Sequence, residues 1–330
     1  MGRRASTLFL TLGLLTTACT GKRPDDHAQP ATRVGRDPQI IRVGYQKTGS
    51  LYVLRGRGTL EERLAKLGAE VKWIDFPSGP ALYEAMRGGS VDLGYVGETP
   101  PIFAVAGGVP FVYAAYEPPS PGAEAILVPN DSPVRSVAEL RGKRVAFNRG
   151  SNVHFLLVRA LAEVGLGIED IEPVFLPPAD GRTAFEAGHV DAWIVWDPFY
   201  AAAEMTGAKA LRDAEGLVNN RTYYVARRSF AVEHPKLLEA VLAELEVVAD
   251  WAKRHPAQVA ALYSESTGLP VAVMLRAEQR HDYGAAPMNE AILAEQQGIA
   301  EVFFELGLVP KPVDMRAAFP DPVITWESKE

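Results

Sequence analysis

From residue 39 onward, short apolar runs alternate with longer stretches of helical periodicity. Apolar runs without polar alternation are typical of strands that a parallel sheet buries on both faces. Helices between successive strands of this kind predict an α/β fold. The predicted strands are 40–45, 71–76, 91–96, 111–116, 124–128, 144–147, 173–176, 190–195 and 223–226.

This number of strands exceeds what one compact sheet of ordinary size holds, so the pattern predicts two lobes. We assign residues 39–122 and 227–330 to lobe 1, and residues 123–226 to lobe 2. Residues 235–306 are almost wholly helical in pattern, and we expect these helices to pack back onto lobe 1. The turn signals between them lie at 255–256, 268–270 and 284–287.

The amino terminus has the features of a signal peptide. Arg3 and Arg4 precede an apolar segment, 8–15, that is too short to span a bilayer as a mature helix. Three residues, 16–18, separate this segment from Cys19, the only cysteine of the chain, so no intramolecular disulfide can form. The setting of Cys19 resembles the lipobox of bacterial lipoproteins, although Thr16 stands where leucine is usual.

The lipobox resemblance implies that Cys19 is lipidated and anchors the exported protein to a membrane. Residues 1–19 are then the signal segment, and the polar, Pro-rich residues 20–38 are a flexible tether. The alternative is cleavage at a nearby site and release of the protein in soluble form.

The charge and the histidine pattern exclude several classes of function. The formal net charge is −7, and no stripe of Lys and Arg indicates a surface for nucleic acid. The six histidines and the many carboxylates lack zinc-ligand spacing, and neither a nucleophile elbow nor a phosphate-binding glycine loop is found. We therefore expect no nucleic-acid partner, no metal, no cofactor and no catalysis.

Three loops end a predicted strand and open a helix. Thr99, Ser151 and Asp197 stand at the capping positions of these helices, and Asp197 precedes a helix that begins at Pro198. Free N–H groups in the first turn and the positive end of the helix dipole bind anions. Two such loops that face each other across a cleft between lobes would form an anion site.

Neighbouring residues supply further candidates. Lys47 follows the first strand and either reaches the cleft or lies on the surface. His154 lies one turn inside its helix and is either a donor to an anion or a packed or solvated side chain. Glu98 repels an anion, so we expect it to turn away or to be paired. Arg280, His281 and Asp282 lie in a turn that ends a helix, and this turn is a further candidate to supply a cationic side chain to the site.

The run VDAWIVWDP, residues 190–198, places two tryptophans and two acids at the carboxyl end of a buried strand. Open α/β sheets hold their ligands at this end. Trp193 and Trp196 are either core residues or an apolar wall for a ligand. We assign Trp196 to the wall because it adjoins Asp197, and Trp193 to the core.

Several motifs together resemble the periplasmic aliphatic-sulfonate-binding proteins of ABC transporters. The most specific are GSxxH at 150–154 and DAWxxWDP at 191–198. The others are IRVGYQK from Ile41, FPSGP from Phe76, GETPPIFA from Gly97, YEPPSPGAEAILVP from Tyr116, VAFNRGSNVH from Val145, LPPADGRTAF from Leu176 and LVPKPVDMR from Leu308. They extend over nearly all of residues 41–316, whereas residues 280–287 depart from the pattern of that group.

The resemblance implies a two-lobed type II periplasmic-binding-protein fold with two crossing strands that closes on a sulfonate. It also implies delivery of the ligand to a membrane permease driven by a cytoplasmic ATPase, for use as a sulfur source, and we expect a monomer. A sulfonate is ionised at any biological pH, so its site needs N–H and O–H donors and no general base. The residues that would line the cleft are Gln46, Lys47, Gly97, Glu98, Thr99, Gly150, Ser151, Asn152, His154, Trp193, Trp196 and Asp197.

Three alternatives remain at the level of the sequence. The same fold could bind taurine, nitrate or a pyrimidine precursor, because a few side chains decide the ligand class. An enzyme on this fold is less favoured, because the chain combines an export signal with no catalytic set. A receptor's sensor domain is disfavoured because no later apolar segment is long enough to span a membrane.

Overall fold

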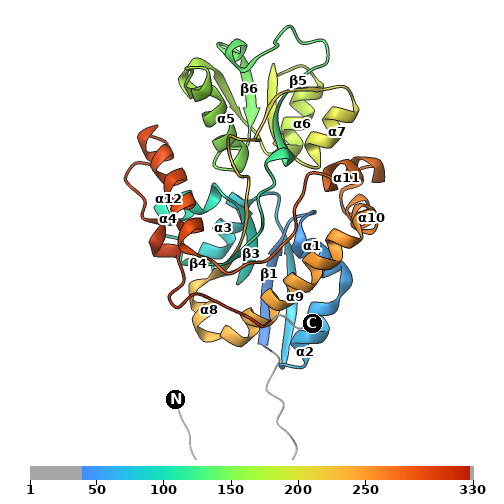
Figure 1. The fold of residues 1–330 in the computed structure, drawn as a ribbon, viewed down its shortest axis with the longest axis vertical. Helices are drawn as coiled ribbons and strands as arrows, with labels where there is room; N and C mark the ends of the chain where they lie inside the picture. The colour runs from blue at the N-terminus through green and yellow to red at the C-terminus, as the bar shows by residue number, and fades with distance from the viewer. Residues whose placement is uncertain (1–38, 328–330) are drawn as a thin grey trace, which may run out of the picture. The chain divides into compact units, whose positions relative to one another are not determined.

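The computed structural model describes residues 39–327, and the predicted signal segment, the tether and Cys19 lie outside these residues. The described residues form two lobes within one compact unit, each lobe built on a five-stranded mixed sheet (Figure 1). This architecture confirms the predicted α/β, two-lobed fold.

In the sheet of lobe 1, four strands run in one direction, and one strand, between two of them, runs in the opposite direction. β1 pairs in parallel with β2 and β3, whereas β10 runs antiparallel to β3 and β4. The order across the sheet is β2 (Ala69–Asp75), β1 (Gln39–Tyr45), β3 (Leu93–Gly97), β10 (Thr222–Arg227) and β4 (Phe111–Tyr116).

The sheet of lobe 2 repeats this topology. β6 pairs in parallel with β7 and β8, and β5 runs antiparallel to β8 and β9. The order is β7 (Glu172–Phe175), β6 (Arg144–Phe147), β8 (Ala192–Trp196), β5 (Glu124–Val128) and β9 (Lys209–Asp213). β5 is wholly buried, as its run of apolar residues predicts.

The chain passes from lobe 1 to lobe 2 between β4 and β5 and returns between β9 and β10. The predicted boundary after residue 226 is therefore wrong, because β10 belongs to the sheet of lobe 1. A run such as Tyr223–Ala226 has the composition of a buried strand, but its composition does not indicate which sheet it joins.

Each of the nine predicted strands has a counterpart in the structure, with ends that differ by at most two residues. One further strand, β9, was not predicted. Its sequence KALRD contains three charged residues, and none of its residues is fully buried, so it lacks the apolar pattern of a central strand.

Helices cover both faces of each sheet. Lobe 1 carries α1 (Ser50–Arg57), α2 (Thr59–Ala65), α3 (Gly79–Arg87), α4 (Pro100–Ala106), α8 (Arg228–Glu233), α9 (Pro235–Arg254), α10 (Pro256–Thr267), α11 (Val271–Glu278) and α12 (Glu290–Glu305). Lobe 2 carries α5 (Asn152–Glu163), α6 (Pro178–Glu186) and α7 (Phe199–Met205).

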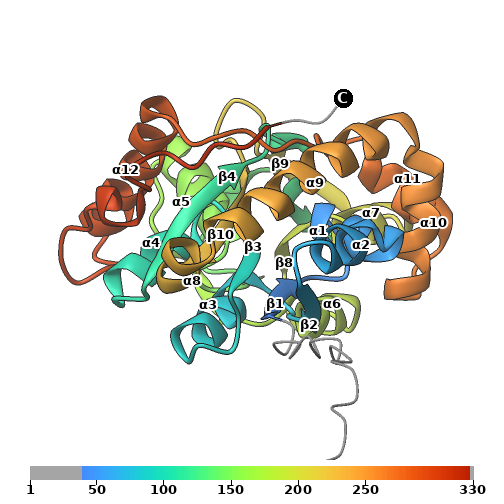
Figure 2. The same cartoon turned by 90° about the horizontal axis from the view of Figure 1, so that it is seen from below.

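The C-terminal helices pack onto lobe 1, as predicted. α9 contacts α1 and α2 on one side of the sheet, and α12 contacts α4 on the other (Figure 2). α11 leaves α10 and lies against α7 of lobe 2. Among residues 39–327, no helix is long and apolar enough to cross a membrane.

Candidate ligand-binding site

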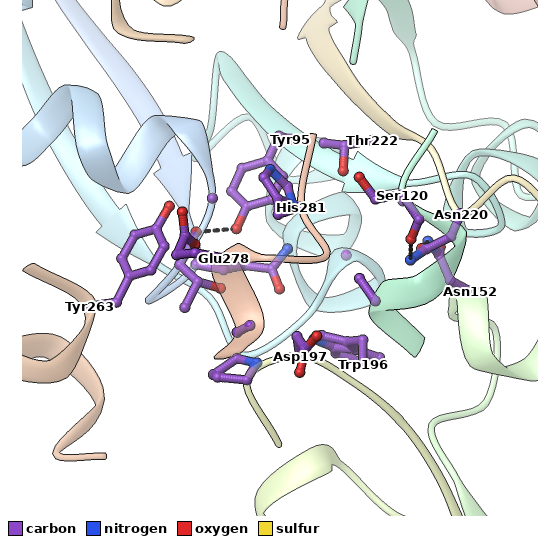
Figure 3. Close-up of a pocket in the computed structure, with 18 of the residues that line it drawn as sticks. Tyr95, Ser120, Asn152, Trp196, Asp197, Asn220, Thr222, Tyr263, Glu278 and His281 are labelled. Atoms are coloured by element: carbon purple, nitrogen blue, oxygen red, sulfur yellow. Dashed lines mark hydrogen bonds between the residues drawn. The ribbon is translucent and has the colours of Figure 1, made fainter. Parts of the chain in front are cut away.

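A pocket lies where loops of both lobes meet the two crossing segments (Figure 3). Its walls come from the carboxyl ends of β1, β3 and β8, from the starts of α1, α3, α4 and α5, and from α10, α11 and the segment after α11. The lining residues are Gln46, Thr48, Gly49, Gly79, Tyr95, Gly97, Pro100, Ser120, Ala123, Ser151, Asn152, Trp196, Asp197, Pro198, Asn220, Thr222, Tyr263, Met274, Ala277, Glu278, His281 and Tyr283.

The start of α5 directs backbone donors into this pocket. Ser151 is the N-cap residue in extended conformation, and Asn152 begins the helix. The side chain of Ser151 does not cap the helix as predicted, because its hydroxyl donates to the Asn148 carbonyl at 2.7 Å. The Asn152 and Val153 N–H groups have no partner within the helix and lie at the positive end of its dipole, whereas the His154 N–H donates to the Ser151 carbonyl at 3.0 Å.

The start of α4 offers fewer donors than we predicted. Thr99 does not cap the helix, its hydroxyl is buried without a partner, and Pro100 and Pro101 have no N–H group. The Thr99 N–H approaches the Asn152 Oδ1 at 3.5 Å. Of the two helix starts expected to bind an anion, only that of α5 keeps open first-turn donors.

A third helix start, that of α1, was not predicted as part of the site. Gly49 adopts φ 86° at its N-cap, and a Cβ there would lie 2.6 Å from the Tyr95 hydroxyl oxygen. Both the positive φ and the lack of space for a Cβ therefore require glycine at this position. The Tyr95 hydroxyl donates to the Thr48 carbonyl and fixes this loop against β3. The strand–loop–helix pattern of residues 45–50 is the signal that could have revealed it.

Asn152 connects the start of α5 to both lobe 1 and a crossing segment. Its Nδ2 donates to the Asn220 Oδ1 at 2.6 Å, and the Asn220 Nδ2 donates to the Ser120 carbonyl at 2.9 Å. Asn220 lies in one crossing segment and Ser120 in the other. One chain of amide hydrogen bonds therefore joins lobe 2 to both crossing segments.

The two tryptophans of β8 lie in different surroundings. Trp193 is 1% exposed and packs against Phe185 and Phe199 in the core of lobe 2. Trp196, at the end of the strand, is half-buried and lines the pocket. Residues three apart on a strand point to opposite faces, so this strand period could have excluded Trp193 from the predicted lining set.

Asp197 lies beside Trp196 and holds the start of α7, which begins at Phe199 rather than at Pro198. Its Oδ1 accepts a hydrogen bond from the Ala201 N–H at 2.9 Å, although the N-cap residue of α7 is Pro198 and not Asp197 as predicted. Burial raises the pKa of the Asp197 carboxyl to about 6, against the opposing effect of the neighbouring Arg280 guanidinium.

The α11 side of the pocket carries acidic and phenolic groups. Tyr283 donates to the Glu278 Oε2 at 2.7 Å, and the hydroxyls of Tyr263 and Tyr283 are 3.0 Å apart. Burial raises the pKa of Glu278, and the nearby His281 opposes this shift. The His281 Nε2 lies 3.6 Å from the Glu117 Oε2. Glu278, His281 and Tyr283 are close in the sequence, but the sequence does not show that they meet Tyr263 and Glu117.

Glu98 does not line the pocket, and its Oε1 is buried without a hydrogen-bond partner. It is 1% exposed, and its Oε2 accepts a hydrogen bond from the Arg221 N–H at 3.2 Å. Burial raises its pKa to about 8. Glu98 is therefore not part of the lining set in which we had placed it.

His154 and Lys47 also lie outside the pocket lining. The His154 ring stacks on Phe147, and its Nδ1 accepts from the Gly150 N–H at 3.2 Å. Burial lowers the pKa of His154 to about 4, so the ring is neutral near pH 7. Lys47 is exposed at the surface. His154 is thus a packed side chain, which was the alternative to an anion donor.

The structure brings together half of the predicted site residues. The residues that line the pocket are Gln46, Gly97, Ser151, Asn152, Trp196 and Asp197. The residues that do not line it are Lys47, Glu98, Thr99, Gly150, His154 and Trp193. Among residues 39–327, no group of three or more His, Cys, Asp and Glu is arranged to hold a metal ion.

Residues 37–265 match the model of the NMT1-like family. A protein of Escherichia coli (strain K12) that is named for binding aliphatic sulfonates is 41% identical over 282 residues, which are 84% of this chain and 88% of the relative. The chain belongs to the NMT1-like family.

Two solved structures support this family membership. The alkanesulfonate-binding protein SsuA of Xanthomonas axonopodis pv. citri, bound to MOPS, is 38% identical with a TM-score of 0.81, over 86% of this chain and 99% of that one. The periplasmic aliphatic sulphonate binding protein SsuA of Escherichia coli is 39% identical with a TM-score of 0.78, over 89% and 94%. This member of the NMT1-like family is thus a homologue of SsuA.

Proposed function

We propose that this protein binds aliphatic sulfonates between its two lobes as the periplasmic solute-binding component of an ABC importer. Its relatives named above are binding proteins, and the proposed activity is capture and delivery of the ligand without chemical change. The observation that carries the proposal is the open start of α5 at Ser151 and Asn152, beside Trp196 in one pocket.

Neutral donors suit a ligand that is always a monoanion. The first-turn N–H groups of α5 supply hydrogen bonds and the positive end of a dipole, so a formal cation is not required. The sulfonate group is placed beside Asn152, because Glu278 lies on the opposite side of the pocket and like charges repel (Figure 3).

The organic part of the ligand needs an apolar surface, and Trp196 provides the largest one near Asn152 in the pocket lining. Contact with an alkyl chain removes apolar area of both partners from water, which favours longer chains. Aliphatic sulfonates thus match both the polar and the apolar wall of the site.

Isothermal titration calorimetry of the mature protein with methane-, propane- and hexanesulfonate tests the proposal. We expect saturable binding near one ligand per chain, and mass spectrometry should recover the ligand unchanged. Chemical conversion of the ligand, or tighter binding of taurine, nitrate or sulfate than of every alkanesulfonate, would contradict it.

A charge placed at the start of α5 provides a sharper test. Asn152→Asp adds a carboxylate beside the proposed sulfonate position and should weaken every sulfonate by at least about tenfold through like-charge repulsion. Asn130→Asp adds the same charge at an exposed position after β5 and should leave the affinity unchanged. Equal affinities for the two variants would place the sulfonate elsewhere.

The membrane anchor and the partners form a second part of the proposal. Cys19 carries the lipid that anchors the protein, the protein is a monomer, and a permease with a cytoplasmic ATPase receives the ligand. The support is the lipobox-like segment that ends at Cys19. Cys19→Ala should release the exported protein from the membrane fraction, and an unmutated protein that is already released would refute the anchor.

A further inference from the structure

Arg280 joins the two lobes at the rim of the pocket. Its Nη1 lies 3.3 Å and 3.2 Å from the two carboxylate oxygens of Asp197, and its Nη2 donates to Glu204. The side chains of Arg280 and Asp197 are 10% and 9% exposed. The guanidinium carbon also lies 3.8 Å from the centre of the Tyr200 ring. Arg280 is therefore surrounded by Asp197, Tyr200 and Glu204.

Arg280 and these partners belong to different lobes. Asp197, Tyr200 and Glu204 follow β8 on α7 and its approach, in lobe 2. Arg280 follows α11, which packs against α10, and α10 contacts α1 and α9 of lobe 1. The contact thus bridges the two lobes where α11 lies against α7.

An apolar contact accompanies the ion pair. Ala201 and Ala202 of α7 pack against Val273 and Ala277 of α11 in a small buried cluster. Ala277 and Asp197 both line the pocket, so the interface between α7 and α11 is continuous with the pocket wall.

The charge of Arg280 is fully matched in this position. Arg276 donates to Glu204 from its Nε and its Nη2, each at 3.0 Å, so two arginines face two carboxylates, Asp197 and Glu204. Of the two carboxylate partners of Arg280, Asp197 is nearly buried and Glu204 is partly exposed, and charge-assisted hydrogen bonds to both hold the guanidinium in a fixed geometry. Its donors are directed at lobe 2 and not at the pocket interior.

From this geometry we infer that Arg280 is a positioning residue that holds the lobes closed over the ligand by binding Asp197, and that it is not the counter-ion of the bound anion. The inference rests on the proposed function, because it concerns the binding of a sulfonate. It assigns to Arg280 a role in retaining the ligand rather than in recognising its charge.

The first test compares two arginines on the same side of the cleft. Arg280→Gln removes the buried charge and should weaken methane-, propane- and hexanesulfonate alike by at least about tenfold, through faster dissociation. Arg276→Gln removes a guanidinium that is 46% exposed and bonded to Glu204, and it should weaken binding by less than about threefold. Stopped-flow Trp fluorescence measures dissociation, and small-angle X-ray scattering measures ligand-induced compaction.

The second test separates a closing role from a counter-ion role. Asp197→Asn leaves Arg280 with one carboxylate fewer, so a counter-ion would then bind the sulfonate more tightly. A closing contact predicts the opposite, weaker binding and less compaction. The double variant Asp197→Asn with Arg280→Gln should bind about as weakly as either single variant, because both remove the same contact.

The outcomes distinguish this inference from the proposed function. If the unmutated protein binds no sulfonate, the proposed function fails. If it binds sulfonates and Arg280→Gln binds and compacts equally well, or Asp197→Asn binds more tightly, the inference is overturned. Thermal melting of each ligand-free variant identifies any that is unfolded, and Arg280→Lys, which keeps the charge, should retain more affinity than Arg280→Gln.

Discussion

The side chain of Asn152 fills the space that a side chain at position 97 would need. A Cβ built on Gly97 would lie 1.9 Å from the Asn152 Oδ1. Gly97 ends β3 of lobe 1, and Asn152 begins α5 of lobe 2, so this contact measures how closely the lobes approach beside the pocket. The hydrogen bond to Asn220 holds the Asn152 side chain in place.

Gly97→Ala should therefore prevent full closure. The added methyl group forces Asn152 away from Asn220 or keeps the lobes apart, and we expect at least about tenfold weaker binding of every sulfonate by calorimetry. Gly122→Ala, in a crossing segment, meets no atom closer than 3.4 Å and is the matched control. The prediction is wrong if the two variants bind propanesulfonate equally well.

The two tryptophans of β8 should differ in what they affect. Trp196→Ala should weaken hexanesulfonate much more than methanesulfonate, because each buried methylene contributes about 0.8 kcal/mol. Trp193→Ala should instead destabilise the fold by about 3–5 kcal/mol in urea unfolding, since it leaves a cavity in the core of lobe 2. A loss from Trp196→Ala that does not depend on chain length would remove Trp196 from the apolar wall.

Ser151→Ala should have a small effect on affinity. The hydroxyl of Ser151 already donates to the Asn148 carbonyl, so it does not supply the main donor to the ligand. The backbone N–H groups remain in the variant, and we expect less than about tenfold weakening for methanesulfonate. A loss of a hundredfold or more would show that the hydroxyl turns toward the ligand on binding.

Glu98 should make the protein less stable as the pH rises. Its pKa in the folded state is raised to about 8 from an ordinary value of 4.5, because burial disfavours the charged form. A carboxyl with a raised pKa stabilises the fold fully below its ordinary pKa, and this contribution is lost as the pH rises to about 8. The melting temperature should therefore fall between pH 5 and pH 8.5.

Glu98→Gln removes this titration while keeping an oxygen that accepts from Arg221. The variant should lose less stability than the unmutated protein over the same pH interval. Glu124 is also buried with a raised pKa, so the slope is reduced and not abolished. Glu290→Gln, at an exposed carboxylate bonded to Arg316, should leave the slope unchanged. Identical slopes for all three proteins would refute the assignment to Glu98.

The sequence determined nine of the ten strands in the described residues, the fold class and one of the helix starts at the site. Apolar runs such as 111–116 and 124–128 are local patterns, and burial on both faces of a sheet requires them wherever the strand pairs. The start of α5 follows β6 by a short loop, which places its N–H groups at the carboxyl edge of the sheet. These features depend on neighbours in the chain, so the sequence by itself contains them.

The tertiary structure alone decided which of these groups meet. The sequence does not show that β10 joins the sheet of lobe 1, or that Glu278 and Tyr263 face a pocket shared with Asn152. Arg280 approaches Asp197 across 83 residues of chain. Such contacts form when helices and sheets pack against one another, and packing depends on the shapes and charges of whole surfaces rather than on the local pattern of any one segment.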